Sequence, residues 1–235
     1  MFEGRATRTV QRWMRCAARG REAPGALVVH DVVAAARMVA GELLQQLDDG
    51  GRRWQHTRAV AARAAEALPL LPPEQGPLLL AAAWLHDVGY SPRVARSGFH
   101  PVDGAAYVRV HLPTRAVAGL IAQHSGARFL ADARGLNHLM HPFARREYWT
   151  GVLPDALTWA DQTTGPDGRP VTVEERLAEM LDRHGPDSPN ARANVRRAPQ
   201  VIAAVRATEA RLAASGSYAD RSGSAVSDTL MREGE

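Results

Sequence analysis

One stretch, residues 78–90 with the sequence LLLAAAWLHDVGY, constrains the fold of this chain most strongly. Its apolar part is long enough for about three helical turns, and it ends in the adjacent imidazole and carboxylate of His86 and Asp87, with Gly89 close behind. Burying unpaired ionised side chains costs several kcal/mol unless an opposite charge or a metal ion compensates. This pair alone leaves two interpretations open. Either His86 and Asp87 bind a cation, or His86 is a hydrogen-bonded core histidine and Asp87 caps a neighbouring helix.

The composition favours an all-α fold. Of 235 residues, 45% are hydrophobic, which suffices for a core, and these are rich in alanine and leucine while only 6% of the chain is aromatic. All 29 basic residues are arginine, and the net charge of +4 fits anionic ligands. The basic residues are spread along the chain, so nucleic acid is not expected as a partner.

Cysteine usage and hydropathy indicate a cytoplasmic protein without a membrane partner. Cys16 is the only cysteine, which excludes an internal disulfide framework and a four-thiolate zinc site. No apolar run reaches the roughly 20 residues of a membrane span. The first 25 residues are broken by arginines throughout, which does not resemble a signal peptide.

The pattern predicts one helical domain over residues 26–212 between two tails. Residues 1–25 are expected to be a mobile basic extension, which is either solvated or touches RNA or membrane phosphates. Residues 213–235 are rich in Ser, Gly and acidic residues and are expected to be disordered.

Helices are expected in most of the domain. A second His-Asp pair, His30 and Asp31, is not expected to bind metal. Asp31 stands where the N-cap of a helix belongs, and no earlier histidine is present to complete a metal site. Residues 127–150 are irregular in pattern. The expected helices cover residues 31–47, 53–68, 78–85, 101–110, 114–124, 154–161, 173–183, 191–197 and 199–212.

The order of the ionisable residues resembles the HD-domain metalloenzymes. His56, then His86 and Asp87, then Asp161 at the end of a later helix give the H…HD…D pattern. The segments HTRAVA, AAAWLHDVGY, FHPVDGAAYV, IAQHS and TWADQTT are similar to superfamily segments and stand in the usual order over residues 53–183. The resemblance implies a helical bundle with a metal site between its helices.

Two imidazoles and two carboxylates form a mixed donor set that suits Mn, Fe, Co, Ni or Zn. The resemblance implies that His56, His86, Asp87 and Asp161 hold a first divalent ion, with His86 and Asp87 central to catalysis. In dinuclear members the counterpart of Asp87 bridges to a second ion, and His100 and His124 occupy the slots of its ligands. The alternative is that His100 merely precedes the helix-initiating Pro101 and that His124 is a polar residue ending a helix. One or two ions per chain are therefore expected.

This chain departs from many HD hydrolases just after the HD pair, where Tyr90 stands in place of a lysine. Arginines are candidates to bind the substrate phosphate instead, and the alternative for each is a solvated surface arginine. Two threonines after Asp161 are candidates to hydrogen-bond substrate or to cap the helix. These substrate candidates are Arg93, Arg96, Arg128, Thr163 and Thr164.

The resemblance implies a metal-dependent phosphohydrolase that cleaves a phosphate ester or anhydride of a small, nucleotide-like substrate by metal-activated water. The six candidate ligands in a single domain look like the bacterial HD hydrolases of diadenosine tetraphosphate. The enzymatic alternative is a mixed-valent di-iron oxygenase, because some HD proteins with the same ligand order have that activity. A third possibility is a non-catalytic HD module that binds metal or nucleotide.

Overall fold

The computed structural model describes residues 29–112 and 114–232, with side chains described for residues 32–112 and 114–216. Within these residues the regular elements are helical, and one isolated antiparallel bridge joins Thr164 and Pro170. The all-α prediction is confirmed. None of the described helices combines the length and the apolar character needed to cross a bilayer.

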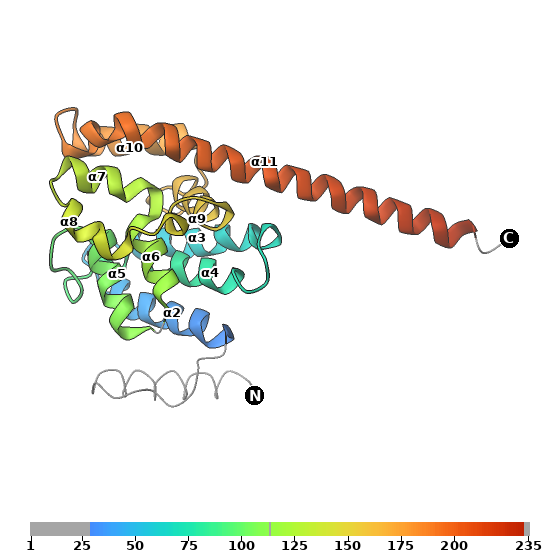
Figure 1. Ribbon diagram of the computed structural model, residues 1–235, viewed down its shortest axis with the longest axis horizontal. Helices are drawn as coiled ribbons and strands as arrows, with labels where there is room; N and C mark the ends of the chain where they lie inside the picture. The colour runs from blue at the N-terminus through green and yellow to red at the C-terminus, as the bar shows by residue number, and fades with distance from the viewer. Residues whose placement is uncertain (1–28, 113, 233–235) are drawn as a thin grey trace.

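The helices form a compact bundle from which the last helix extends (Figure 1). Short 3-10 helices connect several of them, at Leu68–Leu70, Val88–Tyr90, His124–Gly126, His141–Phe143 and Arg146–Tyr148. The α-helices are α2 (Val29–Leu44), α3 (Arg52–Glu66), α4 (Gly76–Leu85), α5 (His100–His111), α6 (Arg115–Gln123), α7 (Ala127–Ala133), α8 (Asn137–Met140), α9 (Val152–Gln162), α10 (Val173–His184) and α11 (Pro189–Arg232).

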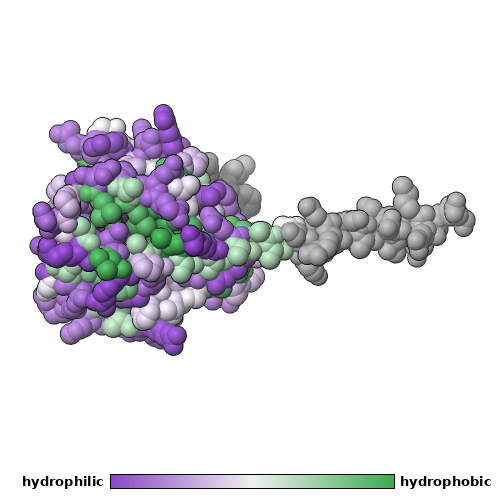
Figure 2. Space-filling model, turned by 90° about the horizontal axis from the view of Figure 1, so that it is seen from above, coloured by the Kyte–Doolittle hydropathy of each residue, from purple (hydrophilic) through white to green (hydrophobic). Residues whose placement is uncertain are grey.

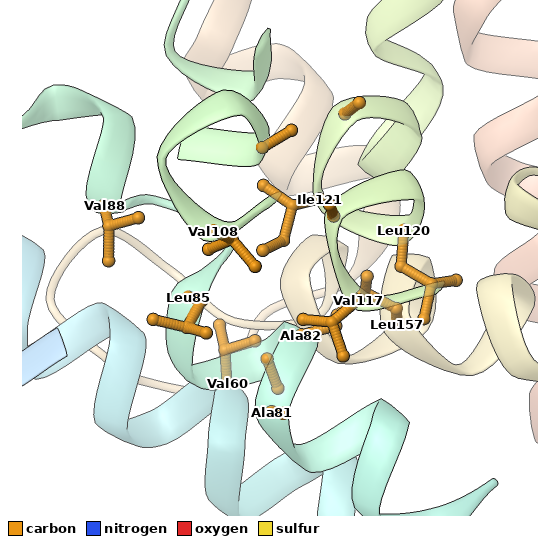
Figure 3. Packing of buried hydrophobic residues seen from close by; sticks show 14 of the residues in the cluster. Val60, Ala81, Ala82, Leu85, Val88, Val108, Val117, Leu120, Ile121 and Leu157 are labelled. Carbon is orange, nitrogen blue, oxygen red and sulfur yellow. The ribbon is translucent and has the colours of Figure 1, made fainter. Parts of the chain in front are cut away.

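Helix α4 is the centre of the bundle. It packs against α2, α3, α6 and α9, and a helix that is apolar on every side is stable only when it is covered on every side. Ala81, Ala82 and Leu85 are fully buried, and Figure 3 shows them among side chains of the neighbouring helices, including Val60 and Leu157. The small alanines let the surrounding helices approach closely, and they place the end of α4 deep in the protein.

Most predicted helices agree with the structure to within a few residues, and the cap of α6 explains one such agreement. The Oγ1 of Thr114 accepts a hydrogen bond from the backbone N–H of Val117 at 3.1 Å, which fixes the start of α6. The N-cap prediction for Asp31 is wrong, because α2 begins at Val29 and Asp31 lies in its first turn. Residues 127–150, irregular in pattern, contain short helices.

The two helices expected over residues 191–197 and 199–212 are one helix, α11, with Pro199 inside it. A proline in a helix interior costs about 3 kcal/mol because it lacks an N–H donor and crowds the preceding turn. Helix α11 packs against α7, α9 and α10, and this packing outweighs the local cost. Tertiary contacts of this kind are not visible in a local pattern.

The structure describes little of the two tails expected on either side of the helical domain. The basic extension over residues 1–25 lies outside the described residues. The backbone of α11 is helical to Arg232, and side chains are described only to residue 216, so the disordered tail stays a prediction.

Seen from the side of α10 and α11, the surface is mostly hydrophilic, with hydrophobic residues gathered in a smaller central area (Figure 2).

Candidate metal centre

The structure brings the six candidate ligands together from five helix ends. Two stand near the start of a helix, His56 in α3 and His100 in α5, and Asp161 stands at the end of α9. The others, His86, Asp87 and His124, directly follow α4 and α6. All are buried except His100, whose side chain is 20% exposed.

Three imidazoles are held in one tautomer by backbone carbonyls. The Nδ1 atoms lie 2.9 Å from the Gly165 oxygen for His56, 2.8 Å from the Ala83 oxygen for His86, and 2.6 Å from the Ile121 oxygen for His124. A carbonyl only accepts hydrogen bonds, so each Nδ1 carries the proton. Each Nε2 is then left with a lone pair available to a metal ion, which is the usual arrangement for ligating histidines.

These lone pairs point at one another and at two carboxylates. The Nε2 atoms of His56 and His86 are 3.4 Å apart, and Asp161 Oδ1 lies 3.2 Å from His56 Nε2 and 3.9 Å from His86 Nε2. Converging lone pairs and negative charges in a buried site repel one another unless a cation lies between them. The donor set therefore fits a divalent transition metal ion.

The carboxylate of Asp87 faces both halves of the cluster. Its Oδ2 lies 3.4 Å from His86 Nε2 and 3.9 Å from His56 Nε2, and its Oδ1 lies 3.4 Å from His100 Nε2. Two groups of potential ligand atoms, each within 4.8 Å of one another, share this residue: His56 with His86 and Asp87, and Asp87 with His100 and His124. A shared carboxylate between two such groups is the arrangement expected of a bridging ligand.

The second oxygen of Asp161 is used to orient the side chain. Its Oδ2 accepts hydrogen bonds from the hydroxyl of Ser125 and from Gln162 Nε2, the latter at 2.8 Å. Ser125 is the only non-glycine residue of the described chain with a positive φ, at 50°. This strained backbone conformation, which costs of order 1–3 kcal/mol, positions the hydroxyl so that Asp161 Oδ1 is left facing the histidines.

The charged groups of the cluster strongly shift one another's pKa values. Burial opposes the charged form of His86, but the adjacent Asp87 carboxylate outweighs it and raises the pKa of His86 to about 9. Burial likewise works against the charged carboxylates, yet the neighbouring imidazoles, and Arg53 in the case of Asp87, hold the pKa values of Asp87 and Asp161 well below the usual range. In the metal-free protein, a proton on His86 partly compensates the negative charge.

Metal binding should therefore strengthen with pH up to about 9. His86 must lose its proton to coordinate an ion, so the apparent affinity is expected to fall roughly tenfold for each pH unit below the pKa of His86. In the metal-free protein the sign is opposite. The raised pKa stabilises the fold fully below about pH 6.5, and that contribution is lost as the pH rises through about 9. Titration with Mn²⁺ at pH 6.5, 7.5 and 8.5 measures the effect, and an affinity that does not change over this range would contradict it.

A close backbone approach holds His100 beside Asp87. A Cβ atom added at Gly89 would lie 2.0 Å from the carbonyl oxygen of His100 and 2.8 Å from the backbone nitrogen of Gly104. Both neighbours are backbone atoms of the first turns of α5. Glycine at position 89 is therefore required for α5 to pack directly against the segment that carries Asp87.

Gly89→Ala is expected to destabilise the protein by about 1–3 kcal/mol, as overpacking of a rigid core typically does, and to displace His100. Chemical denaturation measures the loss in stability. Gly41→Ala in α2 is the matched control, because a Cβ there meets its nearest neighbour, Gln45, at 3.5 Å, and the substitution should be neutral or stabilise by up to about 1 kcal/mol. Equal stability of the two variants would show that the approach at Gly89 is not tight.

Arg53 and Tyr90 cover one side of the cluster, and sequence reasoning missed Arg53. Its Nη1 donates to Asp87 Oδ2 at 2.7 Å, and its guanidinium lies 3.9 Å from the centroid of the Tyr90 ring. Tyr90 in turn stacks on the His100 ring at 4.0 Å. The signal was its spacing, because Arg53 is three residues before His56 and thus on the same face of α3.

The cluster opens into a cavity of about 380 Å³ that is rich in arginine. Five arginines and two aspartates are the charged side chains that line it, in addition to histidines, so positive charge dominates its wall. A loop over one side is held by Asp103, whose carboxylate accepts hydrogen bonds from the backbone N–H groups of Arg96, Ser97 and Gly98 at 3.0–3.1 Å. The lining arginines are Arg53, Arg134, Arg176, Arg183 and Arg197.

The five residues proposed for substrate binding are not among the lining residues. Arg93 donates to Glu42 at 2.8 Å, and Arg128 lies over the Trp149 ring and bonds to Gln200. Arg96 contacts backbone carbonyls of its own loop. The hydroxyls of Thr163 and Thr164 each donate at 2.7 Å to the carbonyl four residues earlier in α9. Arg93 and Arg96 are thus exposed surface arginines, Arg128 is a part-buried arginine packed against an aromatic ring, and the two threonines bond to the end of α9.

Comparison with known proteins agrees with this geometry. No match was found among curated proteins or among solved structures. The sequence model of the HD domain matches residues 53–186, more than half of the chain. That range begins at Arg53, three residues before His56, and includes all six residues of the cluster. The chain therefore belongs to the HD domain family.

Proposed function

We propose that this protein is a phosphohydrolase that cleaves a phosphate ester or anhydride of a small, nucleotide-like molecule. Members of the HD domain family are generally metal-dependent phosphohydrolases. The observation that carries the proposal is the combination of a His/Asp cluster suited to metal ions with a cavity wall in which arginines outnumber aspartates. Such a wall attracts an anionic substrate and repels a cationic one.

In this proposal His56, His86, Asp87 and Asp161 would hold one ion, and His100 and His124, together with Asp87, would hold a second. A divalent ion bound there supplies a Lewis acid and lowers the pKa of coordinated water to near neutrality. Mn, Fe, Co, Ni and Zn all suit this nitrogen and oxygen donor set.

The chain's own residues orient this centre and its substrate. Ser125 and Gln162 hold Asp161 so that one oxygen faces His56. Arg53 donates to Asp87, and its guanidinium lies over the ring of Tyr90. Tyr90 occupies the position at which many HD hydrolases carry a lysine. The Arg53 guanidinium thus places a positive charge 3.9 Å from the centroid of the Tyr90 ring, and it is proposed to bind the phosphate under attack.

Diadenosine tetraphosphate and related nucleotides remain the substrates predicted by the resemblance. Oxygen dependence separates this function from the oxygenase alternative, because hydrolysis needs water and a Lewis acid, whereas an oxygenase needs reduced iron and consumes O₂. Protein loaded anaerobically with Mn²⁺ or Co²⁺ is expected to hydrolyse nucleotide substrates at the same rate with and without O₂, as followed by chromatography of the nucleotide products together with an assay of released phosphate. Phosphate release only with iron and O₂ would overturn the proposal.

A further inference from the structure

Three of the arginines that line the cavity come from the two helices beyond the metal ligands. Arg176 and Arg183 lie seven residues apart on α10, a spacing that returns side chains to the same helical face. Arg197 lies on α11, which packs against α10 (Figure 1). The two helices therefore contribute three arginines to the cavity wall, and Arg176 and Arg197 are close enough to repel each other electrostatically.

Arg197 is a part-buried cation that forms no ion pair with a carboxylate in the described part of the chain. Its Nε donates to the Ser125 carbonyl at 2.7 Å and its Nη2 donates to Gln162 Oε1 at 3.0 Å. Both acceptors are neutral, and burial lowers the pKa of Arg197 to about 10. These contacts fix the guanidinium, and its charge is compensated only partly, by the nearby carboxylate of Asp161, with which it forms no ion pair.

Arg176 and Arg183 share one carboxylate partner among the residues whose side chains are described. Glu179 lies 2.5 Å from Arg176 Nη1 and 3.5 Å from Arg183 Nε. The side chain of Arg176 is 11% exposed, and its buried Nε has no hydrogen-bond partner. Among the described residues, Glu179 is the one carboxylate that pairs directly with any of these three arginines, and Arg176 Nε is an unused buried donor.

We propose that Arg176, Arg183 and Arg197 form a second phosphate-binding subsite, which holds a phosphate of the substrate that is not under attack. Arginine forks match phosphate oxygens and provide charge-assisted hydrogen bonds. Gln162 links this subsite to the metal cluster, because it bonds to Arg197 through its oxygen and to Asp161 through its nitrogen. A phosphate held by Arg197 therefore lies one side chain away from a metal ligand.

The inference deepens the proposed function and rests on it for the meaning of the site. It names the substrate class as molecules with at least two phosphate groups, such as nucleoside polyphosphates. Monophosphates would engage the metal cluster alone and would bind more weakly.

Binding of inorganic tripolyphosphate to the full-length, metal-free protein tests the subsite without relying on turnover. Calorimetry is expected to show Arg197→Gln and Arg176→Gln each weakening this binding by at least about tenfold, since hydrogen bonds to charged groups are worth about that factor or more. Arg206→Gln on the same helix α11 is the matched control, because Arg206 is 71% exposed and is not among the residues that line the cavity. Circular dichroism checks folding, and the half-exposed Arg183 provides a third variant if the buried ones do not fold.

Two results would overturn the inference. One is tripolyphosphate binding that is unchanged in the folded arginine variants. The other is citrate binding as tightly as tripolyphosphate, which would make the site a general carboxylate site. Loss of tripolyphosphate binding in these variants supports the subsite even if the loaded protein releases no phosphate, so failure of the proposed function is recognised separately.

Discussion

Asp87→Asn is expected to remove both metal binding and phosphate release while the protein stays helical. Asp87 is the residue shared by the two potential ligand groups, and its two oxygens face different histidines. Changes to residues that merely support a ligand typically cost 10–100-fold, so loss of the shared ligand should lower phosphate release by more than about 100-fold. Elemental analysis and a phosphate assay on the same preparation measure both effects.

Asp132→Asn is the control for this variant. Asp132 is an exposed carboxylate that pairs with Arg196 at 2.8 Å on the surface, and its loss should change stability by no more than about 0.5 kcal/mol and leave metal content unchanged. Wild-type metal content and turnover in folded Asp87→Asn would sink the assignment of the centre.

His100→Ala and His124→Ala are expected to remove one ion and leave the other. Both residues belong to the group that meets the first group only at Asp87, so metal content should fall from about two ions per chain to about one. His56→Ala should instead disturb the ion on the opposite side of Asp87. His138→Ala in α8 is the control, because that exposed histidine lies outside both groups.

The structural alternative predicts different numbers. A histidine that only flanks a helix can be removed at modest cost in stability and without change in metal content. A single ion in the wild type that survives both replacements would make the centre mononuclear and would favour simple monophosphatase chemistry.

The placement of the six cluster residues could be predicted from sequence because each stands at or near a helix end. Helix ends are signalled by local features, such as Pro101 after His100 and the capping Thr114 before α6. The all-α fold followed from composition and periodicity in the same way. The family's order of motifs then connected residues that are more than 100 positions apart, from His56 to Asp161.

The cationic wall could not be predicted, because it depends on how distant helices pack. Arg93, Arg96 and Arg128 stand in segments that the sequence indicates as loops, yet they contact Glu42, a neighbouring backbone carbonyl and Gln200 respectively. The arginines that line the cavity come largely from α10 and α11, whose positions follow from tertiary packing. With 29 arginines distributed along the chain, sequence alone does not distinguish the few that face the cavity.

The straight course of α11 was missed for a related reason. Two features of the sequence indicate breaks between helices, Pro199 and the segment GPDSP at residues 185–189. The helix continues through Pro199, whereas residues 185–189 lie at the boundary between α10 and α11. Packing of α11 against three other helices decides the outcome at Pro199.

The central claim is that the His/Asp cluster holds a metal ion that phosphate release requires. The most direct measurement is an anaerobic titration of chelator-treated protein with Mn²⁺ in the presence of a nucleoside polyphosphate, following phosphate release. We expect no release without metal, a rise as ions are added, and a plateau at about one or two ions per chain. Hydrolysis that is equally fast in the metal-free protein, or no hydrolysis at any metal content across a panel of nucleotides, judged by released phosphate and by chromatography of the nucleotide products, would contradict the account.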